Sequence, residues 1–89
     1  MKVETTEAFD RALRALSLAD FDVVASALRK LPNAFGRPHA HSGVRKLRGQ
    51  IYEVRAGLDR RIMFRKERDR LLLLFLGNHD QIRRFLKNI

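Results

Sequence analysis

The spacing of the apolar residues changes at Pro32, and this change constrains the fold more than any other feature of the sequence. Before Pro32, apolar residues recur every three or four positions in two runs, which is typical of amphipathic helices. The runs are Phe9, Ala12, Leu13 and Leu16, and then Phe21, Val24, Ala25, Leu28 and Leu31. After Pro32, short runs of alternating or continuous apolar residues are separated by glycine and charged turns, which is typical of strands.

The two predicted helices have start and stop signals. Thr5 or Thr6 can cap the first helix, because a hydroxyl group there accepts an unpaired backbone N–H, and Asp20 can cap the second. Pro32 is expected to end the second helix, since proline has no N–H to donate. The short link at 17–19 favours an antiparallel helical hairpin.

Five segments are expected to be strands: Lys2 to Thr5, Val44 to Arg48, Ile51 to Ala56, Arg60 to Lys66 and Arg70 to Leu76. The last segment is apolar on both faces, which predicts a central position in the sheet. A short terminal helix follows, with Ile82, Phe85, Leu86 and Ile89 on one side. The predicted fold is a single α+β domain over residues 1–89, of order β-α-α-β-β-β-β-α. Its two N-terminal helices and its C-terminal helix pack on one face of a mainly antiparallel twisted sheet.

The positive charge of the chain is confined to its second part. Residues 1–36 carry five basic and five acidic groups, whereas residues 37–89 carry fourteen basic and five acidic groups, and so the whole net charge of +9. Arginine outnumbers lysine 14 to 5, and its planar fork matches phosphate oxygens. We therefore expect a surface for nucleic acid, ahead of a merely solvated basic face and of an acidic membrane.

Composition excludes several classes of protein. The chain has no cysteine, which excludes a disulfide scaffold, a zinc ribbon and a thiol nucleophile. The longest apolar run, Leu71 to Leu76, is far too short to span a membrane. The N-terminus lacks the layout of a signal peptide, so a cytoplasmic location is expected.

Alternation along the strands sorts the cations by face. Arg61 and Arg65 share one side of their strand with Met63, opposite Ile62 and Phe64. We expect the apolar pair to face the helices and the two arginines to face outward. By the same rule Arg55 lies on the side of Glu53, and Lys46 and Arg48 add further cations. A sheet face with converging cations suits a polyanionic strand, although scattered charges that prevent aggregation would give a similar pattern.

His79 is the sharpest single candidate for chemistry. It follows the Gly77-Asn78 turn at the end of the apolar strand, and an imidazole can act as a general acid or base near neutral pH. A lone histidine at a helix start is also common as a surface or capping residue. His39 and His41 lie in a loop, where an H-x-H pair without a third ligand is weak support for a metal site.

Several segments together resemble the RelE/ParE superfamily of type II toxin–antitoxin toxins. They are the two N-terminal helices, GVRKLRG at 43–49, IYEVRAG at 51–57, DRRIMF at 59–64, LLLLFLGNHD at 71–80 and RRFLKN at 83–88. The resemblance covers nearly the whole chain. It implies a small toxin that cleaves mRNA in the ribosomal A site and is neutralised by an acidic antitoxin, with which it can form a hetero-oligomer. It also implies a reaction without metal or other cofactor, in which the ribose 2′-hydroxyl attacks the adjacent phosphate and leaves a 2′,3′-cyclic phosphate.

The resemblance implies roles for particular residues. Arg61 matches the arginine that stabilises the scissile phosphate, and Arg55 matches a basic residue of the preceding strand. His79 resembles the histidine of the G-x-H motif in the YafQ-like branch, where it is a catalytic acid or base. The residues expected to contact RNA are Lys46, Arg48, Arg65, His39, His41 and Phe85. Phe85 lies near a position that is tyrosine in RelE, so proton transfer is expected to depend on His79, and Glu53 stands where a lysine is frequent.

Two alternatives remain open at this point. A ParE-like toxin has the same fold but poisons DNA gyrase, and the missing tyrosine favours it, whereas His79 and Arg61 disfavour it. The other alternative is a module without catalysis that binds RNA or a protein partner.

Overall fold

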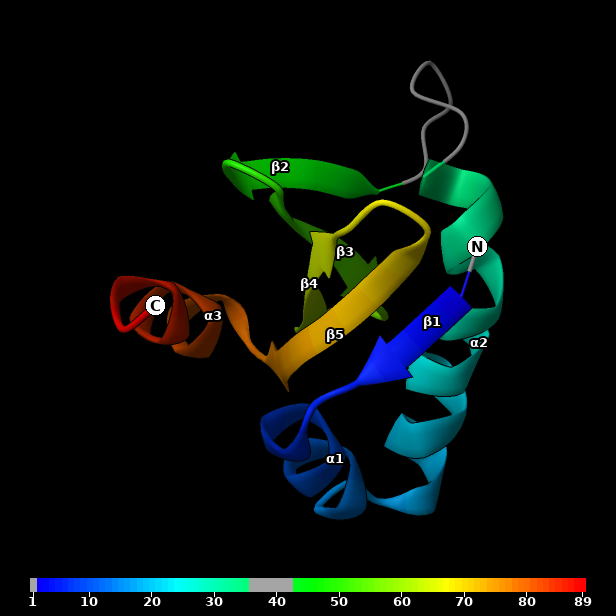
Figure 1. Ribbon diagram of the computed structural model, residues 1–89. Coiled ribbons are helices and arrows are strands. Elements are labelled where there is room, and N and C mark those ends of the chain that lie inside the picture. The colour runs from blue at the N-terminus through cyan, green and yellow to red at the C-terminus, as the bar shows by residue number, and fades with distance from the viewer. Residues whose placement is uncertain (1, 36–42) are drawn as a thin grey trace.

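A computed structural model describes residues 2–35 and 43–89, and the predicted order of helices and strands is confirmed (Figure 1). The elements are β1 (Lys2–Thr5), α1 (Glu7–Arg14), α2 (Leu18–Phe35), β2 (Val44–Arg48), β3 (Ile51–Ala56), β4 (Arg60–Lys66), β5 (Arg70–Gly77) and α3 (His79–Lys87). Among the described residues, no helix is long and apolar enough to span a membrane.

The strands form one sheet in the order β1-β5-β4-β3-β2. Strand β1 runs parallel to β5, and the other neighbouring pairs are antiparallel. The apolar strand β5 therefore lies between β1 and β4, which confirms that it is inside the sheet. The edge strand β2 carries three of the basic residues, Arg45, Lys46 and Arg48.

Helices cover both faces of the sheet, so the expectation that all three pack on one face is wrong. Helices α1 and α2 cover one face, over a core of Phe9, Val24, Leu31, Val54, Ala56, Ile62, Phe64, Leu71, Leu73 and Leu76. Helix α3 covers the other face, over a smaller core of Ile51, Met63, Leu74 and Ile82. Figure 1 shows α3 on the opposite side of the sheet from α2.

A β-bulge in β5 explains how the second core forms. Met63 pairs with Phe75 but Phe64 pairs with Leu73, so Leu74 is an extra residue in β5. Leu74 and Phe75 consequently both belong to the side packed against α3, where strict alternation would have separated them. Phe75 stacks on Phe85 of α3 with ring centroids 4.6 Å apart.

The helix limits differ from expectation in two places. Thr6 caps α1 by accepting a hydrogen bond from the N–H of Phe9, as expected. Helix α2, however, begins at Leu18, and Ser17 Oγ accepts from the N–H of Asp20, so Asp20 lies in the first turn and is not the cap. The helix also continues through Pro32 to Phe35. Pro32 lies in the last turn, where its missing N–H removes one hydrogen bond close to the helix end.

Candidate active site

The turn between β5 and α3 is fixed by a reciprocal cap. Asn78 Oδ1 accepts from the N–H of Gln81 at 2.9 Å, and Gln81 Oε1 accepts from the N–H of Asn78 at 2.8 Å. A Cβ atom on Gly77 would lie 2.7 Å from Gln81 Oε1, so a side chain at position 77 would disrupt the cap. This arrangement holds His79 as the first residue of α3, next to the end of the sheet.

Arg61 connects His79 to the sheet. Gly77 in β5 is the register partner of Arg61, and Arg61 Nη1 lies 3.0 Å from His79 Nδ1. A guanidinium can only donate hydrogen bonds, so Nδ1 must be the acceptor. We therefore assign His79 as the neutral tautomer with its proton on Nε2, because an imidazolium has no lone pair to accept this bond.

Glu53 is the one charged residue that is buried in the described part of the chain, with 4% of its surface exposed. Its Oε1 accepts a hydrogen bond from Arg61 Nη1 at 3.0 Å and forms an ion pair with Arg45 Nη2 at 3.0 Å. Strand register places Arg45 directly across from Glu53, on the side of the sheet that α3 partly covers. A buried carboxylate is costly unless it is paired and hydrogen-bonded. Here two guanidinium groups supply opposite charge, and Arg61 also supplies the hydrogen bond.

An open depression of about 530 Å³ lies over this cluster. It is lined by Gly43, Val44, Arg45, Glu53, Arg55 and Arg61. Three arginines and one carboxylate give it a net charge of 3 − 1 = +2. The depression is therefore suited to an anion, and His79 contacts Arg61 without itself lining the depression.

The structure brings together Arg55, Arg61 and His79, the residues expected from the sequence to be catalytic. Arg55 and Arg61 are register partners on β3 and β4, and Arg55 is exposed at the rim of the depression. Arg61 was expected to face outward into solvent, but α3 and Glu53 cover most of it and leave 21% of its side chain exposed. Arg65 is on the same side of β4 as Arg61 but opposite Ile51 and Leu72, outside the depression.

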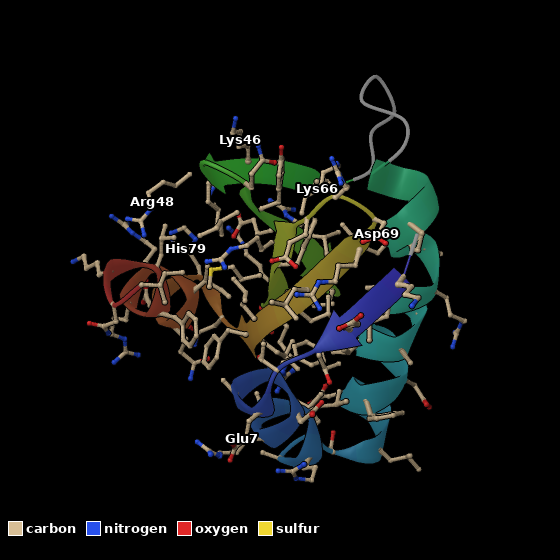
Figure 2. All side chains as sticks on the ribbon, viewed as in Figure 1. Glu7, Lys46, Arg48, Lys66, Asp69 and His79 are labelled. Carbon is tan, nitrogen blue, oxygen red and sulfur yellow. The ribbon has the colours of Figure 1, made fainter. Side chains whose placement is uncertain are left out.

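Two other predicted RNA contacts, Lys46 and Arg48, lie elsewhere. Lys46 pairs with Tyr52, which packs against the α1 and α2 side of the sheet, so Lys46 does not join the depression. Arg48 donates to the carbonyl oxygens of Leu86 and Ile89 at 3.1 and 2.8 Å, and thereby holds the C-terminal end of α3. Figure 2 shows Lys46 on the outer side of β2 and Arg48 beside α3.

Phe85 packs on Phe75 beneath α3, which favours the packing role of its ring over base stacking. His39 and His41 lie outside the described residues. Within 2–35 and 43–89, no group of three His, Asp or Glu side chains is placed to hold a metal ion.

Sequence reasoning missed Arg45 and the contact role of Glu53. Alternation assigns residues to faces within one strand but does not give the register between strands, so Arg45 and Lys46 were equivalent until β2 was paired with β3. A signal was nevertheless present at Glu53, because it is a carboxylate inside an apolar strand segment with arginines before and after it.

No family model matches the chain, and no curated protein matches it by sequence. Solved structures with the same fold do exist. YafQ from E. coli superposes with a TM-score of 0.73 at 11% identity, over 91% of this chain and 96% of that one. A YoeB/ParE toxin from Agrobacterium tumefaciens gives a TM-score of 0.67 at 19% identity, over 89% of this chain and 99% of that one. The archaeal RelE–RelB complex from Pyrococcus horikoshii OT3 contains a chain with a TM-score of 0.65 at 22% identity, over 86% of this chain and 92% of that one. Together with the element order and sheet topology, these matches show that the chain has the α+β fold of the RelE, YafQ and YoeB/ParE toxins.

Proposed function

We propose that this protein is the toxin of a type II toxin–antitoxin pair and cleaves mRNA on the ribosome. The observation that carries the proposal is the contact of Arg61 Nη1 with His79 Nδ1 at 3.0 Å beside a depression of net charge +2. A proton-transfer group and a phosphate-binding group thus adjoin at one end of the sheet, on a fold shared with known toxins.

In the proposed reaction the ribose 2′-hydroxyl attacks the adjacent phosphate. The 2′-hydroxyl proton moves to His79, the bond from O2′ to phosphorus forms, and the bond from phosphorus to O5′ breaks. The imidazolium then returns a proton to O5′, giving a 2′,3′-cyclic phosphate and a 5′-hydroxyl. The need for a 2′-hydroxyl restricts the substrate to RNA, and acid–base catalysis of this kind contributes about 10²- to 10⁴-fold in rate.

The tautomer of His79 determines when this histidine can act as the base. Its one available lone pair is on Nδ1, which Arg61 occupies in the structure. His79 can accept the 2′-hydroxyl proton there only when its contact with Arg61 Nη1 is released. Substrate binding would release this contact as the remaining donors of Arg61 engage the phosphate, where negative charge develops, while Nη1 keeps its contact with Glu53.

Arg55 and Arg61 are the proposed phosphate ligands. They are cross-strand neighbours on two interior strands of the sheet, which is favourable for aligning a reacting phosphate. Arg65 extends positive charge along the same side of β4 and is proposed to attract the RNA backbone at longer range.

An acidic antitoxin is the proposed protein partner. All the excess positive charge lies in residues 37–89, and the structures with this fold include RelE–RelB complexes from Pyrococcus horikoshii and Methanococcus jannaschii. Covering the basic depression with an acidic segment would block access of RNA to Arg55 and Arg61.

The test uses purified protein, ribosomes programmed with a defined mRNA, and mapping of the RNA ends produced. Cuts at a fixed codon position with a 2′,3′-cyclic phosphate are expected for the wild type. His79→Gln should still bind the ribosome but cleave about 10²- to 10⁴-fold more slowly, because the amide keeps a hydrogen-bonding group but cannot transfer a proton. Asp80→Asn, at the exposed neighbouring position, is the matched control and should cleave normally.

Two results would contradict the proposal. If the wild type leaves mRNA intact but causes DNA breaks with gyrase, the protein acts as a gyrase poison. Full cleavage by His79→Gln would exclude the acid–base role of the imidazole.

A further inference from the structure

Arg45 and Glu53 have no role in the reaction proposed above, although both line the same depression as Arg55 and Arg61. Glu53 Oε1 accepts a hydrogen bond from Arg61 and forms an ion pair with Arg45, each at 3.0 Å. One carboxylate oxygen therefore fixes two guanidinium groups that come from different strands, β2 and β4.

From this geometry we infer that Arg45 and Arg61 form a two-arginine site for an RNA phosphate and that Glu53 is its positioning residue. The inference rests on the proposed function for the identity of the ligand, a phosphate of single-stranded RNA. Glu53 itself touches no reacting atom in this assignment. It acts through the two arginines.

The donor count supports a ligand on the open side of these arginines. A guanidinium has five N–H donors in a planar fork. In the described part of the chain, Arg45 uses Nη2 toward Glu53, and Arg61 uses only Nη1, toward Glu53 and His79. The remaining donors of both groups can bind phosphate oxygens without breaking either contact to Glu53.

Burial separates the roles of the three side chains. Glu53 has 6% of its side chain exposed, Arg61 has 21% and Arg45 has 63%. Glu53 is thus the buried member of the site. Arg61 is partly buried beside Glu53, and Arg45 reaches Glu53 from the solvent side. A long side chain that is mostly exposed would otherwise sample many rotamers, so the contact with Glu53 lowers the entropy cost of binding a phosphate.

If Glu53 acted only through its charge, its removal would be expected to strengthen RNA binding. Removing a negative charge from a basic site strengthens its attraction for RNA, because the net charge of the depression rises from +2 to +3. Loss of a positioning residue should instead slow the reaction even when the RNA is fully bound. Electrostatics alone thus predicts tighter RNA binding when the Glu53 charge is removed, whereas a positioning role predicts a lower maximal rate.

The main experiment is single-turnover mRNA cleavage on programmed ribosomes at increasing protein concentration, which separates the maximal rate from the half-saturating concentration. Arg45→Ala is expected to raise the half-saturating concentration or lower the maximal rate by about 10-fold or more. The matched control is Lys46→Ala, which removes the same charge from the adjacent position of β2 on the other side of the sheet. It should remain within about twofold of the wild type.

Glu53→Gln tests the positioning role. It is expected to lower the maximal rate by about 10-fold or more while leaving the half-saturating concentration unchanged or reduced. A wild-type maximal rate for Glu53→Gln would overturn the positioning role. If Glu53→Gln does not fold, as judged by thermal melting, Arg45→Lys decides the matter, because it keeps the charge but loses the fork. Arg45→Lys should then show at least half of the defect of Arg45→Ala on a logarithmic scale, and wild-type kinetics would overturn the proposal.

A binding measurement without cleavage tests this inference separately from the proposed reaction. Fluorescence anisotropy with a short RNA carrying one 2′-deoxy residue measures affinity without cleavage. Arg45→Ala should reduce the slope of log affinity against log salt by about 0.7, as expected for one lost phosphate contact on a single strand, and Lys46→Ala should not. If the wild type fails to cut mRNA but this difference is found, the phosphate site stands and the proposed reaction does not. Equal losses for Arg45→Ala and Lys46→Ala would show a diffuse basic surface and overturn the two-arginine site.

Discussion

Arg61 Nη1 lies 3.0 Å from His79 Nδ1, although the two residues are 18 positions apart in the chain. The contact forms because Gly77 pairs with Arg61 in the sheet and the cap of Asn78 then turns the chain so that His79 begins α3 beside it. A donor-only group therefore determines which nitrogen of the imidazole carries the proton.

The tautomer of His79 can be measured directly. We expect ¹⁵N NMR of the free protein in mildly alkaline buffer to show neutral His79 with its proton on Nε2. Arg61→Ala removes the donor, so the preference for this tautomer should decrease in that variant. Observation of the Nδ1–H tautomer in the wild type would mean that the Arg61 contact does not persist in solution.

Arg61 should contribute to both stability and catalysis, because it contacts buried Glu53 as well as His79. Arg61→Ala is expected to lower the free energy of unfolding by about 1–3 kcal/mol, since the buried carboxylate of Glu53 loses its hydrogen bond from Arg61 and one of its two charged partners. Arg61→Lys keeps a charge near Glu53 and should cost less than about 1 kcal/mol.

Cleavage separates these two roles of Arg61. Both variants should cleave about 100-fold more slowly or worse, because neither presents the planar fork to the phosphate. Urea denaturation and single-turnover cleavage measure the two effects. A stable Arg61→Lys variant with normal cleavage would assign Arg61 to structure alone.

Arg48 should stabilise the C-terminal end of α3. It donates to the backbone oxygens of Leu86, in the last turn of α3, and of Ile89, just beyond that turn. The C-terminal end of a helix attracts positive charge. Arg48→Ala is expected to raise amide hydrogen exchange in the last turn of α3, corresponding to a loss of about 1 kcal/mol. Lys46→Ala, which removes a charge from the same strand, should leave exchange in α3 unchanged.

An acidic antitoxin should protect the basic side of the sheet. Its complex with this protein is expected to weaken as salt increases, because charges at the rim of an interface are screened. Hydrogen exchange of the complex should show protection in β2 and β3, the strands that carry Arg45 and Arg55. Protection confined to residues 9–31 would place the antitoxin on α1 and α2 and contradict this expectation.

Local patterns in the sequence were sufficient for the elements and their order. Hydrophobic periodicity indicated two helices and then strands, and the continuous apolar run at 71–76 correctly placed β5 inside the sheet. Periodicity is a property of neighbouring residues, so each strand could be divided into two faces without knowledge of its partners. That division correctly put Arg61 and Arg65 opposite Ile62 and Phe64.

Only the tertiary structure decided which faces meet and what covers them. The extra residue Leu74 in β5 gives α3 its own core on the second side of the sheet, and no local pattern showed that bulge. Strand register, which depends on pairing across the sheet, selected Arg45 over Lys46 as the partner of Glu53. The sequence by itself thus determined the fold class, the concentration of charge in residues 37–89 and the candidates Arg61 and His79. The contacts that join them depend on distances between residues far apart in the chain, which only packing fixes.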